Sequence, residues 1–117
     1  MKVLVVDDEP LILALYPPLL AKHGIEAVAF DNAKASIEYL KTDTVDAVIS
    51  DIDMPECDGI EFFKTLKDQN IYSGIFVFAT AKWKDEYKYL MDEGVDKVFT
   101  KPFKHKDLAS YLLGLKE

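Results

Sequence analysis

The stretch VLVVDDEP, at residues 3–10, is a short apolar run that ends in two adjacent carboxylates. A run of four apolar residues without polar alternation is typical of a strand that is covered on both faces. The same pattern recurs in AVISD at residues 47–51 and in FVFAT at residues 76–80, and a fourth strand-like stretch, KVFT at residues 97–100, is followed by Lys101. Each strand-like stretch therefore leads into an acidic, hydroxyl or ammonium side chain.

Parallel strands end at the same edge of a sheet, so the groups that follow them lie close together in space. At that edge we expect three carboxylates, one hydroxyl and one ammonium, from Asp7, Asp8, Asp51, Thr80 and Lys101. Carboxylates are ligands for hard divalent cations, and an ammonium with a hydroxyl can hold phosphoryl oxygens. The pattern predicts a site for a divalent cation and a phosphoryl group.

Segments with helical spacing of apolar residues alternate with the strand-like runs. This alternation of strands and helices indicates a parallel sheet. We expect an α/β fold with an open, doubly wound, five-stranded parallel sheet, helices on both faces and one domain over residues 1–117. The expected strands are residues 3–6, 27–30, 47–49, 75–79 and 98–99. The expected helices include residues 37–41, 60–67, 87–91 and 108–115, the last with Leu108, Tyr111, Leu112 and Leu115 on its apolar face.

Individual residues predict where the helices begin, break or end. Asn32 is a suitable cap for the helix that follows it, and Gly94 lies where a helix C-terminus is expected. Pro17 and Pro18 fall inside the first helical segment, where each removes one backbone hydrogen bond. We therefore expect that helix to be kinked or broken just before Pro17.

Composition excludes several classes of protein. Half of the 117 residues are apolar, which is enough for a core, and the lone Cys57 excludes an internal disulfide framework. The net charge of −7 disfavours direct binding to nucleic acid. No apolar stretch approaches the length needed to span a membrane. All 14 basic residues are lysines, so the domain has no bidentate arginine for a phosphate.

The motifs together resemble the receiver domain of two-component response regulators, of the type found in the chemotaxis regulator. The resemblance covers nearly the whole chain, and the motifs occur in the family's order: Asp7-Asp8, Asp51, Met54-Pro55, Asp58-Gly59, Thr80-Ala81 and Lys101-Pro102-Phe103. Any one of these motifs is weak alone, but the set is specific. The resemblance implies a flavodoxin-like sheet with strand order 2-1-3-4-5.

The resemblance implies that Asp51 is the phosphoacceptor and that Mg²⁺ is the cofactor. Asp8 and Asp51 would ligate the metal directly, together with the backbone carbonyl of Asp53, and Asp7 would act through a bound water. Mg²⁺ in proteins typically uses one or two carboxylates and keeps several waters. Crowding of three carboxylates should raise at least one of their pKa values when the metal is absent.

The resemblance also assigns the groups that contact the phosphoryl group. Lys101 would pair with Asp51 and then with the phosphoryl oxygens, while Thr80, followed by Ala81, would donate its hydroxyl. The peptide bond before Pro102 is expected to be cis. Asp53 and Lys82 are expected to pair across the mouth of the site and to shield the phosphoryl group from water.

The resemblance further implies the partners of such a module. The phosphoryl donor would be a histidine kinase or a histidine phosphotransfer protein of a phosphorelay, and the output would be a target protein or effector domain. We expect a cytoplasmic signalling module rather than an enzyme, without direct contact to nucleic acid or membrane. The dimers of receivers in transcription factors often use pairs of arginine with acidic residues, and this chain has no arginine. We therefore expect a monomer or a weak, phosphorylation-dependent dimer.

The chain departs from the family at the aromatic switch residue. Receivers commonly carry Tyr or Phe three positions before the lysine, where this chain has Val98. Phe99 follows directly, but side chains alternate across a strand, so it should point to the opposite face.

We expect His105 to lie on the surface.

Other interpretations of the motifs remain open. Asp7 and Asp8 could simply cap the first helix. Asp51-Ile52-Asp53 is also the DxD of haloacid-dehalogenase phosphatases, although their nucleophile normally follows the first strand of a larger core. A third possibility is a phosphorylation-independent pseudo-receiver that acts only as an interaction module.

Overall fold

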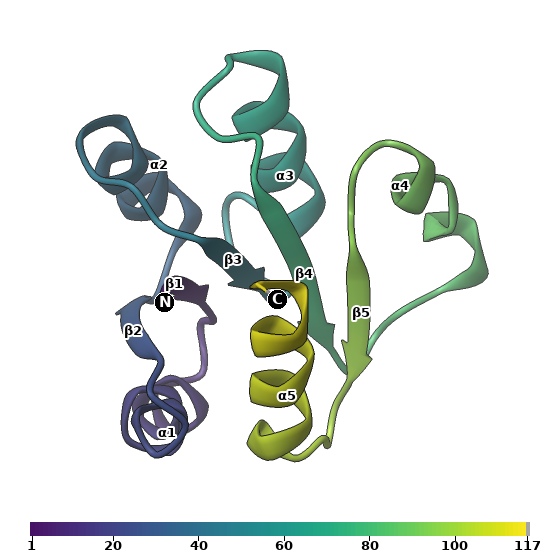
Figure 1. The fold of residues 1–117 in the computed structure, drawn as a ribbon. Helices are drawn as coiled ribbons and strands as arrows, with labels where there is room; N and C mark the ends of the chain where they lie inside the picture. Colours follow the sequence, from purple (N-terminus) through teal and green to yellow (C-terminus); the bar gives the residue numbers. More distant parts are fainter. Residues whose placement is uncertain (117) are drawn as a thin grey trace.

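A computed structural model describes residues 1–116 and the side chains of residues 1–114. Its core is one parallel sheet of five strands in the order β2-β1-β3-β4-β5 (Figure 1). The strands are β1 (Lys2–Val6), β2 (Glu26–Phe30), β3 (Ala47–Ser50), β4 (Ile75–Thr80) and β5 (Lys97–Thr100). Each predicted strand is present, extended by one or two residues. The predicted fold class and strand order are confirmed. Residue 117, the last of the predicted domain, lies outside the described range, as does the side chain of Leu115.

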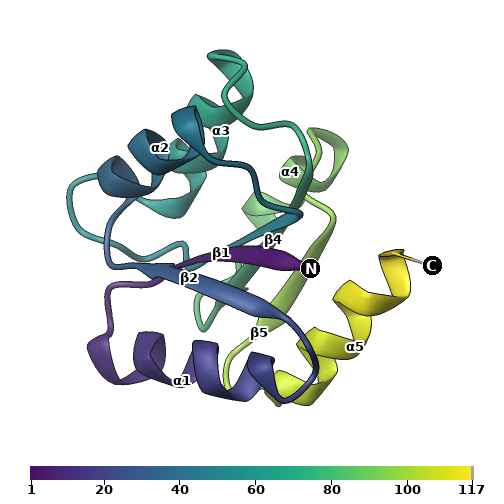
Figure 2. The ribbon, with the colours of Figure 1, turned by 60° about the vertical axis from the view of Figure 1, so that its left-hand side comes forward.

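Helices cover both faces of the sheet. They are α1 (Pro10–Ala21), α2 (Ala33–Thr42), α3 (Gly59–Asp68), the 3-10 turn η1 (Asp85–Tyr87), α4 (Tyr89–Asp92) and α5 (His105–Lys116). Helices α1 and α5 lie on one side of the sheet, and α2, α3 and α4 lie on the other (Figures 1 and 2). None of the helices in the described range is both long enough and apolar enough to cross a membrane.

Alternation along the strands divides the core into two layers. In β1, Leu4 and Val6 pack on the α2–α3 side, whereas Val3 and Val5 pack on the α1–α5 side. In β4, Phe76 and Phe78 belong to the first layer, where they contact Phe63 at ring-centroid distances of 4.9 and 6.4 Å. Burial on both faces is why these strands read as continuous apolar runs.

The strand register brings the carboxyl ends of the central strands together. Val6 of β1 pairs with Ser50 of β3, and Ser50 pairs with Phe78 of β4. The residues that follow, Asp7 and Asp51, therefore leave the sheet side by side. This edge is the switch point at which connections depart to opposite faces, where ligands bind in open α/β sheets.

The predicted helix ends are largely correct. Asn32 accepts a hydrogen bond from the Ala35 backbone N–H at 2.7 Å, which caps α2. Gly94, with a φ of 121°, follows α4 in the left-handed region that favours glycine. The predicted helix near residues 87–91 is present only as η1 and one turn of α4.

The first helix is not broken before Pro17, because α1 runs from Pro10 to Ala21 through both prolines, and the kink stays a prediction. Proline's φ is compatible with a helix, so the cost lies in the lost hydrogen bonds. Tyr16 and Leu20, on either side of the pair, are buried against the sheet. Pro18 and Ala14 are exposed, so water can solvate the Ala14 carbonyl that Pro18 leaves without a helical donor. Tertiary packing thus outweighs the local penalty.

Candidate functional site

A crevice of about 160 Å³ lies at the carboxyl edge of the sheet. Its walls come from the segments that follow four strands: Asp8, Glu9, Asp51, Asp53, Thr80, Ala81, Lys82 and Lys101. Asp7 lies beside this group and contributes to the same cluster of carboxylates. The structure therefore brings together every residue that the sequence singled out for the site.

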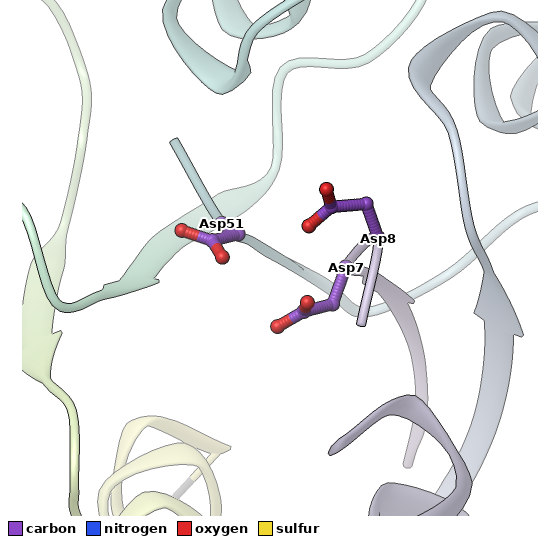
Figure 3. A group of neighbouring side chains, drawn as sticks. All are labelled: Asp7, Asp8 and Asp51. Atoms are coloured by element: carbon purple, nitrogen blue, oxygen red, sulfur yellow. The ribbon is translucent and has the colours of Figure 1, made fainter. Parts of the chain in front are cut away.

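The carboxylates of Asp7, Asp8 and Asp51 form the most concentrated charge of the site. One oxygen from each lies within 4.8 Å of the others, and the side chains of Asp7 and Asp8 face Asp51 across a short gap (Figure 3). Asp7 and Asp51 are buried, with 1% and 6% exposed, whereas Asp8 is partly exposed. Three close oxygen donors at the mouth of a crevice suit a hard divalent cation.

Lys101 neutralises part of this charge. Its Nζ donates to Asp7 Oδ2 at 2.6 Å and to Asp51 Oδ2 at 3.1 Å. Burial disfavours the charged ammonium, but the bond to Asp7 and the charges of Asp51 and Asp7 outweigh burial and raise the pKa of Lys101. The bond between Lys101 and Pro102 is cis, as predicted. The hydrogen bonds to Asp7 and Asp51 place the Lys101 ammonium beside the carboxylate of Asp51.

Backbone contacts hold Asp51 in place. Asp51 Oδ1 accepts a hydrogen bond from the Ile52 N–H at 2.7 Å, and Ser50 Oγ donates to the Asp51 carbonyl at 2.7 Å. The Gly59 N–H donates to the Ile52 carbonyl at 2.8 Å. A Cβ on Gly59 would collide with the backbone carbonyl of Asp51. Gly59 therefore allows α3 to pack directly against the loop that carries Asp51.

The surroundings of Asp8 raise the pKa of its carboxyl group. Its pKa is raised, first by burial and then by repulsion from Asp7, Asp51 and Asp53. The predicted rise in a carboxylate pKa is thus present, although desolvation contributes more to it than the neighbouring charges. A cation bound at this edge would relieve both effects.

Thr80 and the residues after it form the opposite wall. Thr80 is fully buried, and its Oγ1 accepts a hydrogen bond from the Lys82 N–H at 3.1 Å. The hydroxyl proton remains free to be donated to a group in the crevice. The side chains of Lys82 and Asp53 pair at 2.9 Å across the mouth, as predicted, and each is about two-thirds exposed.

Two residues at or near the crevice, Glu9 and His105, differ from the expectations drawn from the sequence. Glu9 lines the crevice, and its backbone N–H donates to Asp7 Oδ1 at 3.0 Å. Glu9 is itself the N-cap residue of α1, which has no side-chain cap, so the interpretation of Asp7 and Asp8 as helix caps is wrong and both belong to the acidic cluster. His105, predicted to be on the surface, is partly buried because its ring packs on Tyr16 and Phe103. The signal that could have identified Glu9 is its position in the sequence, directly after the two aspartates of the site.

The position of the family's aromatic switch is occupied differently here. Val98 packs with the α2–α3 layer of the core, on the same side as Trp83. Phe99 points to the other face, where its ring contacts Phe103 at 5.4 Å and Tyr111 at 5.8 Å. The prediction that Phe99 points to the face opposite to Val98 is therefore confirmed.

Comparisons with known proteins agree with this geometry. The family model described as the response regulator receiver domain matches residues 3–113. The alkaline phosphatase synthesis transcriptional regulatory protein PhoP of Bacillus subtilis is 32% identical over 92% of this chain, but the match covers 45% of that protein. The chain spans less than half of the length of the first curated relatives that it matches.

Solved structures give the same result. The receiver domain of Francisella response regulator 1452 has a TM-score of 0.86 and 28% identity, and the match covers 99% of this chain and 98% of that one. The receiver domain of the Pseudomonas aeruginosa sensor histidine kinase PA1611, solved with magnesium in its cleft, has a TM-score of 0.83 and 19% identity; the match covers 97% and 94% of the chains. The match of the receiver-domain model to residues 3–113 contradicts the haloacid-dehalogenase alternative. The chain belongs to the response regulator receiver domains of two-component signal transduction.

Proposed function

We propose that this receiver is phosphorylated on Asp51 and that residues 1–117 form one signalling domain. The observation that carries the proposal is the contact of Asp51 Oδ2 with Lys101 Nζ at 3.1 Å, inside a cluster of three carboxylates. A carboxylate is a weak nucleophile toward an anionic phosphoryl group unless nearby charge is neutralised. The buried ammonium of Lys101 contributes to that neutralisation.

Mg²⁺ is the cofactor that the donor set favours. Asp8, Asp51 and the backbone carbonyl of Asp53 would hold it directly, and Asp7 would hold it through a water. A bound Mg²⁺ would supply positive charge that offsets the carboxylates and the incoming phosphoryl oxygens. The magnesium seen in the PA1611 receiver supports this choice.

Asp51 alone forms a bond to the phosphoryl group, and the other protein groups position the reactants. Asp51 supplies the attacking oxygen. Lys101 pairs first with Asp51 and then with the phosphoryl oxygens, and Thr80 donates a hydrogen bond from its hydroxyl to one of those oxygens. Ala81 is too small to obstruct the phosphoryl group beside Thr80. Positioning and electrostatic stabilisation account for most of the catalysis of phosphoryl transfer.

The donor is a histidine kinase or a histidine phosphotransfer protein in the cytoplasm, and the output is a target protein or effector domain. Phosphorylation shifts a pre-existing equilibrium between two states of the interaction surface. The domain is a signalling module that takes part in its own phosphoryl transfer, and it needs no contact with nucleic acid or membrane. Because Val98 replaces the aromatic residue, movement of Thr80 is transmitted without an aromatic rotamer.

The decisive experiment compares the wild type with Asp51→Asn. Trp83 is a suitable reporter, since its ring lies 6.3 Å from Phe78 of β4 and its side chain is partly exposed. Mg²⁺ is titrated first, and acetyl phosphate or beryllofluoride is added second, with mass spectrometry of the intact protein as an independent readout. We expect a saturable response to Mg²⁺ and an adduct of one phosphoryl group that Asp51→Asn abolishes.

The same experiment separates the proposal from the pseudo-receiver alternative. A domain that neither responds to Mg²⁺ nor forms an adduct by either readout is a phosphorylation-independent interaction module. An adduct that persists in Asp51→Asn would show that another residue is the acceptor. Either result contradicts the proposal.

A further inference from the structure

A second hollow adjoins the acidic crevice and differs from it in chemistry. It has a volume of about 410 Å³ and lies between α1 and the loop that follows β5. Its walls are largely apolar or aromatic and include Ile12, Leu15, Tyr16, Pro102, Phe103 and His105. A mostly apolar hollow with a few polar groups at one end is typical of sites for small organic ligands.

The two hollows share a boundary. Glu9, Ala81 and Lys101 line both of them. Lys101 is the residue that contacts Asp51, and Ala81 follows Thr80 directly. A ligand held in the apolar hollow therefore lies beside the position that we propose for the phosphoryl group.

Packed aromatic rings form the floor of the apolar hollow. Tyr16 is 1% exposed, and its ring meets that of His105 edge-on at 4.8 Å. The His105 ring also lies 5.6 Å from that of Phe103. Within the described residues, the buried His105 Nε2 has no hydrogen-bond partner, and burial lowers the pKa of this imidazole. The floor is therefore uncharged at neutral pH.

Charge is confined to the shared boundary. Lys101 is engaged by Asp7 and Asp51, so Glu9 is the charged residue of the lining that has no ion pair within the described residues. A negative rim beside an apolar floor disfavours anionic chains and accepts neutral ones. The lining thus selects a ligand with a neutral carbon chain.

We propose that this hollow receives the uncharged carbon chain of an acyl phosphate that donates its phosphoryl group to Asp51, an inference that rests on the function proposed above. A carboxylate oxygen of Asp51 forms a bond to phosphorus, and the bond between phosphorus and the acyl oxygen breaks. The acyl group leaves as a carboxylate with the electron pair of that bond, so no proton or oxidant is needed. Acyl phosphates with longer neutral chains are better donors than acetyl phosphate.

The test compares acetyl phosphate with butyryl phosphate on the wild-type domain in the presence of Mg²⁺. The second-order rate constant for the Asp51 adduct is measured by mass spectrometry of acid-quenched samples. Burial of two further methylene groups predicts an advantage of about tenfold for butyryl phosphate. Equal rate constants for the two donors overturn the inference and leave the proposed function intact. Failure to form an adduct with either donor overturns both.

A variant locates the effect in the hollow. Leu15 is 49% exposed, so Leu15→Phe adds bulk at its mouth without forcing a larger residue into the core. We expect this variant to lose the advantage of butyryl phosphate while its rate with acetyl phosphate stays within about twofold. Leu11→Phe is the matched control, because Leu11 is 85% exposed on the same helix and lies outside the hollow. A tenfold advantage that persists in Leu15→Phe, or equal slowing with both donors, overturns the inference.

Discussion

At the scale of single residues, Asp8 shows the conflict between stability and metal binding. Burial and three neighbouring carboxylates raise the pKa of Asp8, so its ionised form is disfavoured in the folded state. Lys101 contacts Asp7 and Asp51 but makes no hydrogen bond to Asp8 within the described residues. Asp8 is thus the member of the cluster with the least compensation from the protein itself.

Removal of the Asp8 charge should stabilise the metal-free domain. In Asp8→Asn the side chain keeps its size but no longer repels its neighbours, so we expect the thermal midpoint to rise by a few degrees. Because Asp8 is a proposed ligand of Mg²⁺, added Mg²⁺ should raise the midpoint of the wild type but not that of this variant. Calorimetry with and without Mg²⁺ measures both effects. A lower midpoint for Asp8→Asn without metal would contradict this account of the cluster.

Lys82 should protect the phosphorylated form from hydrolysis. Its pair with Asp53 lies across the mouth of the crevice at 2.9 Å, and hydrogen bonding to Asp53 raises the pKa of Lys82. We expect Lys82→Ala to speed dephosphorylation by about two- to fivefold, since exposed pairs contribute little energy. Decay of the Asp51 adduct after donor removal is followed by mass spectrometry. Lys84→Ala is the control, and an unchanged rate in Lys82→Ala would refute the shielding role.

At the scale of elements, the start of α3 depends on a single glycine. Gly59→Ala would place a Cβ against the Asp51 carbonyl and should destabilise the fold by about 1–3 kcal/mol. Gly114 in α5 has no atom within 4 Å of a Cβ built at that position. Gly114→Ala should therefore stabilise by about 0.5–1 kcal/mol. Urea unfolding measures the free energy of unfolding of both variants. Equal changes in the two variants would show that a Cβ at residue 59 can be accommodated beside the Asp51 carbonyl.

The packing of α5 on α1 should make stability depend on pH. Burial lowers the pKa of His105 in the folded state, so the unfolded chain binds more protons as the pH falls below about 6.5. The contribution of neutral His105 is complete above that pH and is lost as the pH falls toward its folded pKa. The slope contributed by this residue is at most about 1.4 kcal/mol per pH unit.

Replacement of His105 by leucine should therefore reduce the loss of stability between pH 7 and pH 5.5. His23→Leu is the matched control, because it removes an imidazole that is exposed. Urea unfolding at several pH values measures the slopes. Identical slopes for His105→Leu and the wild type would mean that the pKa of His105 does not differ between the folded and unfolded states.

At the scale of the whole molecule, the net charge of −7 and the absence of arginine bear on assembly. A chain without arginine cannot form bidentate pairs with carboxylates, and like charges disfavour association. We expect a monomer in solution, or a weak dimer that forms only with a phosphoryl mimic. Sedimentation velocity with and without beryllofluoride tests this. A tight dimer without the mimic would contradict it.

The sequence by itself determined the fold class and most of the residues at the site, Glu9 excepted, and its motifs implied the strand order through their resemblance to receiver domains. Continuous apolar runs require burial on both faces, and parallel strands bring Asp7, Asp51 and Lys101 to one edge whatever the details of packing. The alternation of side chains along a strand was also enough to place Val98 and Phe99 on opposite faces. These features depend on local period and on topology, which a single chain displays directly.

Only the tertiary structure decided the features that depend on contacts between distant segments. The helix through Pro17 and Pro18 persists because burial of Tyr16 and Leu20 outweighs two lost hydrogen bonds. His105 is partly buried because the Tyr16 ring, contributed by another helix, packs against it. The apolar hollow beside the crevice likewise exists only where α1 and the loop after β5 meet. Such contacts have no local signature in the sequence, because each partner alone is compatible with exposure.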